Sequence, residues 1–518
     1  MRQLTGHDAS LLYSETLHAN ANLTANVTYV QIYDQRTAPG GKLRFKSILS
    51  HIESRLHLCS LFRNKLLRVP FELDAPYWTE DEHFNLEHHV RHIALPKPGD
   101  WRQFCIQASR IHARALDMTR PLWEIYVVEG LDSFDDLPVG SFALLTKVHH
   151  AAVDAACRAQ IVEVLHDTTR RPPQPAPAQP WFPQEPPGAF ALACMGAVSS
   201  MLAPWKLMNP LLRFAPAALA FASEVFRPSA EPTATRFNAV ASPHRVFDTR
   251  RFMQSEFDRI RALVPGATRG DAVLAVCAGG LRRYLLAHAE LPRDDLAAIA
   301  PIGVGVGVGV GVGIDESDSN SDAQTPAERP WLRVQLGTHL TDPVQRLAWI
   351  QRQTAASPAV APAVALTDRT AALHGMQLAS CTISPVPGSS VPLFLHGARM
   401  TYFSAILPIS DGMGLAYAVT SYDGRIVISP TSCRELMPDP HAFTQCLRDS
   451  FQELLALAVP APAAKQRATS GSKPRAKPAP PHASASGTHS PKPRTARTAS
   501  TALPVGTTAR RRSTAPRR

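Results

Sequence analysis

The chain has 518 residues and a formal net charge of +11, with 45% hydrophobic side chains, 46 prolines and eight cysteines. This length supports two or three domains with a sizeable core, and the absence of any CxxC pair excludes zinc-ribbon and thioredoxin-like classes. Residues 461–518 hold 13 Lys and Arg and no Asp or Glu, so residues 1–460 carry a net charge of −2. Because the positive charge is confined to this segment, the net charge of the chain does not indicate a nucleic-acid-binding fold.

Strand and helix patterns are mixed in the first part of the chain. Residues 24–33 alternate as a strand does, residues 46–56 have helical spacing, and residues 103–116 predict an amphipathic helix. Two further strands are predicted over residues 125–131 and 141–148. The N-terminus has no signal-peptide core, and the scattered cysteines have apolar neighbours, which together predict a cytoplasmic protein with reduced, buried thiols.

A histidine cluster, EHHVRH, places His88 and His92 four residues apart. On a helix this spacing suits two metal ligands. Residues 84–96 alternate and end in Leu-Pro, however, which favours an extended segment in which chelation is difficult. Metal binding is therefore the weaker interpretation.

The stretch KVHHAAVDAA places His149, His150 and Asp154 between a predicted strand and a helix predicted from Asp154 onward. Neighbouring strand residues point to opposite faces, so one ring can enter a cleft while the other packs. A histidine can take up a proton near neutral pH and return it. Asp154 can cap the helix or pair with an arginine. From this pattern alone, two structural histidines or a metal site remain open.

The middle of the chain changes composition twice. Residues 171–188 contain eight prolines, which predicts a stiff linker. The apolar run at residues 189–203 is shorter than the ~20 residues that span a bilayer. We expect one or two apolar helices over residues 189–226, either buried or lying on a membrane surface.

The second half repeats the mixture of elements. Residues 271–289, 342–356 and 443–458 predict helices, residues 400–409 a strand, and residues 415–429 a hairpin that turns at Asp423-Gly424. The sequence therefore predicts a mixed α/β architecture in two halves.

Two low-complexity segments remain. Residues 303–313, GVGVGVGVGVG, cannot match GxGxxG, because strict alternation puts valine where the last glycine is needed, so a loop or irregular edge strand is predicted. Residues 461–518 cannot form a core. They are either a solubilising disordered extension or a weak, salt-dependent contact for anionic lipid or nucleic acid.

HHAAVDAA (149–156) resembles the HHxxxDG motif of the bacterial wax ester synthase/diacylglycerol acyltransferase family, one of the chloramphenicol-acetyltransferase-like, CoA-dependent acyltransferases. RPLWEIYVVEGL (120–131) is similar to the family's PLW block. Further similar blocks follow in family order over residues 4–16, 84–99, 269–285, 336–350, 384–400 and 421–425. The resemblance covers residues 1–458.

The resemblance implies two acetyltransferase-like α/β halves with a central cleft or tunnel, and a disordered basic C-terminal tail. The implied domains are residues 1–170 with HHxxxD, residues 171–235 as linker and apolar helices, residues 236–460 as C-terminal half, and residues 461–518 as tail.

It also implies acyl transfer from acyl-CoA to a diacylglycerol or a long-chain fatty alcohol, with acyl-CoA as co-substrate and no metal or other cofactor. His150 would move the proton, with His149 beside it, and Asp154 would hold the loop. Residues expected to shape the site or bind substrate are Pro121, Leu122, Trp123, Ala155, Asp271 and Ser384, although Trp123 also fits a core position. Expected partners are the acyl donor, the lipid acceptor and, peripherally, the inner membrane or a lipid droplet, with no specific nucleic acid.

Four sites depart from the family pattern. Ala155 replaces the motif glycine, and Gly270 replaces the asparagine that precedes Asp271. Pro385 and Ser389 alter the block that begins at Ser384, and the glycine-valine repeat occupies a region that usually carries a strand. Two hypotheses therefore remain: an active acyltransferase, or a catalytically weakened relative that binds acyl chains or lipid surfaces.

Overall fold

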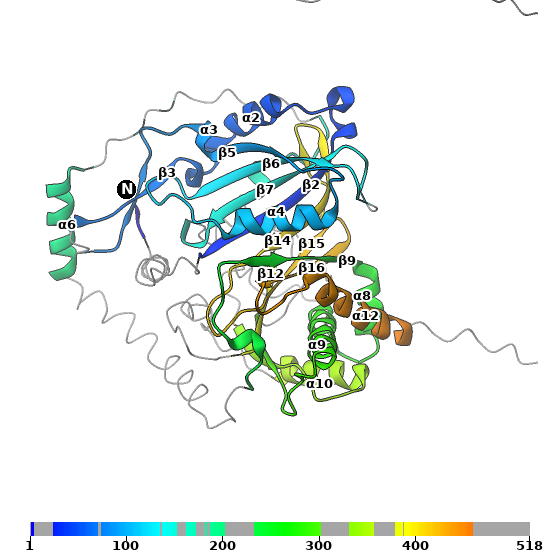
Figure 1. Cartoon of the computed structure of the whole chain (residues 1–518). Coiled ribbons are helices and arrows are strands. Elements are labelled where there is room, and N and C mark those ends of the chain that lie inside the picture. The colour runs from blue at the N-terminus through cyan, green and yellow to red at the C-terminus, as the bar shows by residue number, and fades with distance from the viewer. Residues whose placement is uncertain are drawn as a thin grey trace, which may run out of the picture. The chain divides into compact units, whose positions relative to one another are not determined.

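The computed structural model is mixed α/β, which confirms the predicted fold class (Figure 1). Met1–Ala461 forms one compact unit, and Pro462–Arg518 lies outside the described residues. The structure describes residues 2–4, 24–70, 74–134, 137–152, 162–171, 181, 183, 187–201, 233–301, 331–356, 379–386 and 388–458.

A six-stranded sheet carries the histidine pair, in the order β13-β14-β2-β7-β6-β5. Its pairs are antiparallel except β5–β6, which is parallel. All nine residues of β7 are buried, as a central strand with both faces covered requires. The strands are β2 (Asn26–Asp34), β5 (Val90–Ala94), β6 (Trp123–Leu131), β7 (Ser141–His149), β13 (Phe394–Leu395) and β14 (Ala398–Ile406).

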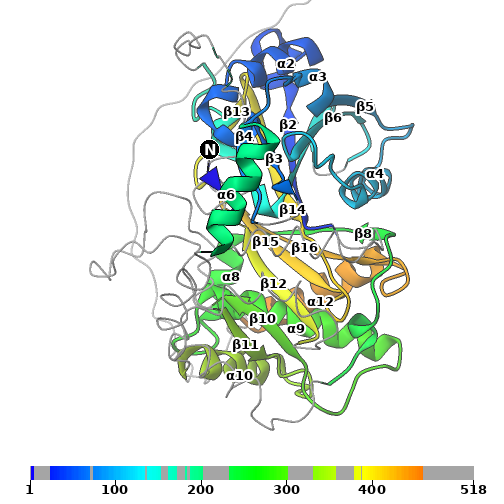
Figure 2. The ribbon, with the colours of Figure 1, turned by 90° about the vertical axis from the view of Figure 1, so that its left-hand side faces the viewer.

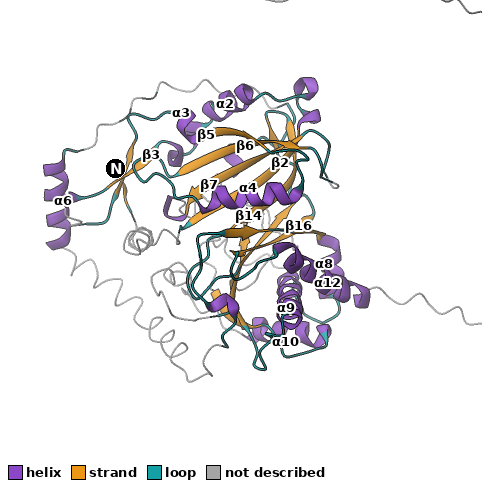
Figure 3. Cartoon of the chain, in the orientation of Figure 1, coloured by secondary structure: helices purple, strands orange, loops and turns teal. Residues whose placement is uncertain are grey.

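Helices cover the two faces of this sheet (Figure 3). Phe104 and Ile111 of α4 (Trp101–Ala113) pack on the face that presents Leu145. Ile48 and Ile52 of α2 (Phe45–Glu53) belong to the core on the opposite face, with Leu144. The alternation of β7 therefore divides its side chains between two apolar layers.

A second sheet has the order β11-β10-β12-β15-β16-β8, with β9 also paired to β16 (Figure 2). The predicted hairpin is confirmed, because Asp423 and Gly424 join β15 and β16 with φ of 48° and 71°. The strands are β8 (Arg245–Phe247), β9 (Arg250–Met253), β10 (Ala297–Pro301), β11 (Trp331–Gln335), β12 (Cys381–Val386), β15 (Ala416–Tyr422) and β16 (Arg425–Cys433).

Four helices accompany the second sheet: α8 (Gln254–Arg261), α9 (Arg269–Ala287), α10 (Pro343–Ala356) and α12 (Pro440–Ala458). The helices α9 and α12 lie against each other at Gly280, where a Cβ would stand 2.5 Å from Leu447 Cδ2. Only glycine allows this approach without a shift of α12.

The remaining elements are small. A three-stranded sheet, β1-β4-β3, packs through Tyr77 against Leu192 of α6. These elements are β1 (Arg2–Gln3), β3 (Asn64–Leu67), β4 (Tyr77–Glu80), α3 (Leu86–His89), α6 (Ala189–Met201) and the 3-10 turns η1 (Gln35–Thr37), η2 (Pro39–Gly41), η3 (Leu56–Leu58), η4 (Ser60–Phe62), η6 (His150–Ala152) and η7 (Arg236–Asn238).

Three local expectations need correction. Residues 86–89 are helical, because the Asn85 side chain accepts the Glu87 N–H and caps a short turn before β5. The helix α6 is not buried, since Phe190 is 83% exposed, and Cys194 on the same helix is exposed rather than buried. In the part of the chain that the structure describes, no helix has the length and apolar character to cross a bilayer.

Some expectations concern residues that lie outside the described ones. They are the helix predicted to begin at Asp154 as far as residue 161, the apolar segment after residue 201, the glycine-valine repeat and the basic tail.

Candidate active site

The turn after β7 is fixed by three backbone amides. The His149 N–H donates to the Leu122 carbonyl oxygen at 3.0 Å, and the His150 N–H donates to the Ala25 carbonyl oxygen at 2.8 Å. The Ala151 N–H donates to His149 Nδ1 at 3.1 Å. The turn is thereby held between the PLW block on one side and the residue before β2 on the other.

The two histidines occupy different environments. His149 is the last residue of β7 and is fully buried. Its Nδ1 accepts a hydrogen bond, so the neutral ring carries its proton on Nε2. His150 opens the 3-10 turn η6 rather than continuing the strand, and it is only half-buried. Of the two rings, that of His150 is the more accessible.

The PLW block lies directly beside this turn. Pro121, Leu122 and Trp123 are all buried. Trp123 pairs with Val148 of β7, its Nε1–H donates to the Phe62 carbonyl oxygen at 3.1 Å, and its ring stacks on that of His89 at 4.5 Å. Trp123 therefore occupies a core position, where its contacts hold β6 against the turn.

A buried lysine lies two residues before His149, on the same face of β7. Lys147 Nζ donates to the Arg114 carbonyl oxygen at 2.5 Å and lies 3.5 Å from Glu124 Oε2. Asn26 Nδ2 donates to the same carbonyl oxygen at 3.2 Å. Burial lowers the pKa of Lys147 from 10.5 to about 8, although the Glu124 carboxylate acts in the opposite direction.

Sequence reasoning missed Lys147 and Asn26. The available signal was a single charged residue in an otherwise apolar strand, SFALLTKV. A buried lysine needs hydrogen-bond acceptors. Here the acceptors are the Arg114 carbonyl oxygen after α4 and the Glu124 carboxylate on β6.

The other predicted site residues lie elsewhere or cannot be placed. Asp154 and Ala155 are outside the described residues. Asp271 is the third residue of α9, where its Oδ2 accepts the Thr268 N–H at 2.7 Å and its Oδ1 accepts the Thr354 hydroxyl at 2.8 Å. Ser384 is half-buried in β12 and pairs with Ala418 of β15. Asp271 thus forms a capping box with Thr268 at the N-terminus of α9.

The second histidine cluster forms separate contacts. His88 is exposed, His89 is buried against Trp123, and His92 Nε2 lies 3.3 Å from Glu129 Oε1. Over the described residues, no three His, Cys, Asp or Glu side chains gather as metal ligands would.

Comparison with known proteins identifies the family. Residues 4–270 match the wax ester synthase/diacylglycerol acyltransferase catalytic domain, and residues 331–455 match the C-terminal domain of the same family. The chain belongs to the wax ester synthase/diacylglycerol acyltransferase family. The predicted family and the predicted enzyme class, an O-acyltransferase, are confirmed.

Individual relatives agree with this assignment. A putative diacylglycerol O-acyltransferase of Mycobacterium tuberculosis is 29% identical in an alignment of 482 positions that covers 88% of this chain and 90% of the relative. The O-acyltransferase WSD of Acinetobacter baylyi is 28% identical over 411 residues, covering 74% of this chain and 83% of the relative.

Solved structures share the fold. A wax ester synthase/diacylglycerol acyltransferase from Marinobacter aquaeolei matches with a TM-score of 0.61 and 22% identity, over 88% of this chain and 99% of the other. The first condensation domain of the calcium-dependent antibiotic synthetase matches with a TM-score of 0.52 and 13% identity, over 88% and 96% of the two chains.

The buried Lys147 predicts a pH dependence of stability. Between pH 8 and 10.5 the unfolded chain binds more protons at this position than the folded chain, so the free energy of unfolding rises with pH across that window. We expect Lys147→Met to remove this rise. The rise itself amounts to a few kcal/mol at most, because each unit of pKa shift corresponds to ~1.4 kcal/mol. Urea unfolding from pH 7.5 to 10.5 measures it, with the exposed Lys42→Met as control. An unchanged slope in Lys147→Met contradicts the buried ammonium.

Proposed function

We propose that the chain transfers the acyl group of acyl-CoA to the hydroxyl of a diacylglycerol or a long-chain fatty alcohol, forming triacylglycerol or a wax ester. The relatives named diacylglycerol O-acyltransferase and wax ester synthase support this choice of substrates. The observation that carries the proposal is the half-buried His150 on a turn whose backbone is fixed by neighbouring strands.

In the proposed mechanism, His150 accepts the proton of the acceptor hydroxyl as the oxygen attacks the thioester carbonyl. The tetrahedral intermediate then collapses, the carbon–sulfur bond breaks, and the imidazolium returns the proton to the leaving thiolate. Both transfers need the same ring at a fixed place, because a displacement of ~1 Å can change the rate about 100-fold.

His149 and Asp154 have positioning roles in this proposal. The His149 ring accepts the Ala151 N–H and so holds the turn that carries His150. Asp154 keeps the geometry of the following loop and handles no proton. The residues at 121–123 hold the neighbouring strand, and acyl-CoA serves as co-substrate. The boundaries 1–170, 171–235, 236–460 and 461–518 are our proposal for the domains.

The histidine roles can be separated by substitution. We expect His150→Ala to lower transfer from palmitoyl-CoA by at least about 100-fold with little change in Tm, because the ring is only half-buried and acts chemically. We expect His149→Ala to keep some activity and to lower Tm, because it empties a buried site and removes the acceptor of the Ala151 amide. Near-normal turnover in purified His150→Ala refutes the assignment.

A catalytically weakened relative that binds acyl chains or lipid surfaces is the second candidate, and the replacement of the motif glycine by Ala155 motivates it. In this candidate, the added methyl group lowers activity through the placement of His150. We therefore expect Ala155→Gly to raise acyl transfer several-fold, with Tm unchanged or slightly lower if the helix predicted from Asp154 onward includes this position. The assay uses palmitoyl-CoA with panels of diacylglycerols and fatty alcohols, which also identifies the acceptor. Equal turnover on every acceptor shows that the substitution is neutral.

We also propose peripheral contact with an anionic membrane or lipid droplet surface, in a cytoplasmic protein. The 13 cationic side chains of residues 461–518 and the exposed Phe190 and Val198 of α6 support this. Deleting residues 461–518 should preserve turnover in solution and weaken binding to anionic vesicles at low salt, where screening is least. Equal co-sedimentation of full-length and truncated protein with such vesicles argues against a membrane role for the tail.

A further inference from the structure

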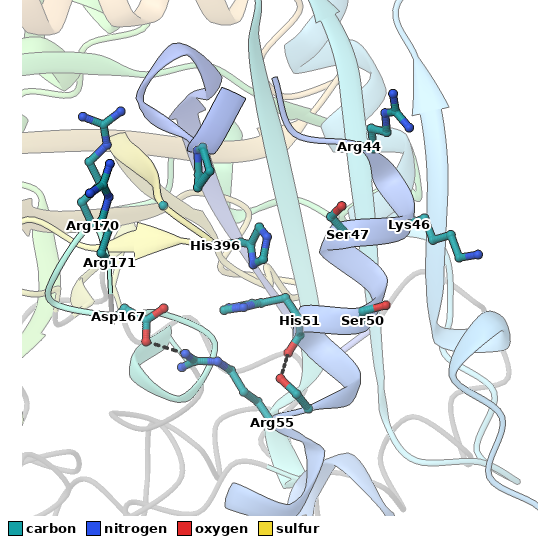
Figure 4. Close-up of a pocket in the computed structure, with 13 residues that line it drawn as sticks. Arg44, Lys46, Ser47, Ser50, His51, Arg55, Asp167, Arg170, Arg171 and His396 are labelled. Carbon is teal, nitrogen blue, oxygen red and sulfur yellow. Dashed lines mark hydrogen bonds and ion pairs between the residues drawn. The ribbon is translucent and has the colours of Figure 1, made fainter. Parts of the chain in front are cut away.

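A basic pocket lies beside α2, on the six-stranded sheet (Figure 4). Its volume is about 670 Å³. We call it the α2 pocket. Its walls come from α2, from the segment at residues 167–171 and from the turn between β13 and β14, where His396 is located.

The α2 pocket has more cations than its carboxylate can neutralise. Asp167, the one acidic residue that lines it, is ion-paired with Arg55. The other cations are Arg44, Lys46, Arg170 and Arg171, and none of these four is paired with a carboxylate among the described residues. Figure 4 shows Lys46 on α2, Arg44 just before it, and the two arginines of residues 170–171 on the opposite wall.

The floor of the pocket is built from hydrogen bonds. Arg55 is buried and donates through Nη1 to the carbonyl oxygens of Val164 and His166 at 3.0 and 3.1 Å, whereas its buried Nε has no hydrogen-bond partner. His51 Nε2 lies 3.0 Å from the Leu165 carbonyl oxygen, and burial lowers its pKa to about 4, so the ring is neutral. A rigid floor with surplus positive charge above it suits an anionic ligand.

Strand register places the pocket far from the reacting centre. Asn26 pairs with His149, and Tyr33 pairs with Phe142 at the other end of the same strands. The seven steps along the strand from Asn26 to Tyr33 span about 23 Å at ~3.3 Å per residue. The pocket lies at the Tyr33 end, because His166 Nε2 contacts the Tyr33 hydroxyl at 2.6 Å and Arg170 donates to the Thr37 carbonyl oxygen. It can therefore hold only the distant part of a long substrate.

We propose that the α2 pocket binds the phosphate groups of the acyl donor's CoA. The inference rests on the proposed function, which requires a donor whose phosphates are separated from the thioester by a long pantetheine arm. Guanidinium groups pair with phosphate oxygens through two N–H donors, and the hydroxyls of Ser47 and Ser50 line the same wall. Arg44 precedes the first turn of α2, whose amides favour negative charge.

The experiment compares two acyl donors, palmitoyl-CoA and palmitoyl-N-acetylcysteamine, which has the thioester but no phosphate. In the variant Arg44→Gln/Arg170→Gln/Arg171→Gln, we expect the ratio of kcat/KM for the first donor to that for the second to fall at least about ten-fold. Added salt should raise the wild-type KM for palmitoyl-CoA only. The matched control is Arg448→Gln, which neutralises a cation in a different cavity of about 570 Å³ and should leave the ratio unchanged.

The outcomes separate the two claims. A wild-type protein that uses neither donor refutes the proposed acyltransferase, whereas a wild type that uses both and a triple variant with an unchanged ratio overturn only the CoA site. A ratio lowered by Arg448→Gln alone also overturns it. A triple variant that keeps the donor ratio but no longer binds phosphatidylglycerol vesicles overturns the CoA site as well, because the pocket then binds a lipid headgroup. Melting curves check folding, and the salt dependence of the wild type gives a reading that needs no variant.

Discussion

The turn after β7 depends on three backbone amides, and the proposed active-site geometry depends on that turn. One amide is tied to the PLW block, one to the residue before β2, and one to the ring of His149. Because β7 is buried along its whole length, its end cannot move without disturbing both neighbouring strands. The consequence is a buried His149 and a more accessible His150, adjacent in sequence and different in environment.

Both halves of the sequence contribute to the sheet that holds this turn. The strand β14 comes from the second half and pairs with β2 from Arg399↔Asp34 to Ile406↔Thr28. It also contacts the second sheet, where the Ser404 and Ser429 hydroxyls lie 2.6 Å apart and the Thr420 hydroxyl donates to the Phe403 carbonyl oxygen at 2.9 Å. The N-terminal sheet is therefore complete only when the C-terminal half has folded.

Local patterns in the sequence predicted most of the elements. The alternation of residues 24–33, the apolar strand before His149 and the Asp423-Gly424 turn are signals that lie within a few residues, and the structure has strands and a hairpin there. The pairing of β14 with β2 could not be predicted, because it joins residues more than 360 positions apart and no local pattern encodes the partner. The resemblance to the acyltransferase family supplied the expected reaction and the expected role of the histidine pair, which periodicity could not.

The site residues show the same limit. The histidine pair was found from its motif, but the burial of Lys147, the tie between Asn26 and the loop after α4, and the capping task of Asp271 all depend on partners distant in sequence. Residues 86–89 were expected to be extended, although the Asn85 cap was present in the sequence. Side-chain identity indicated which chemistry was available, whereas long-range packing decided which residues could take part in it.

Hydrogen exchange of the amides of His149, His150 and Ala151 tests the central claim most directly. Our account predicts that these three amides exchange as slowly as those in the middle of β7, because each donates to a fixed acceptor inside the protein. Exchange at the rate of an exposed loop would show that the turn is not held, and it would contradict the idea that neighbouring strands position His150.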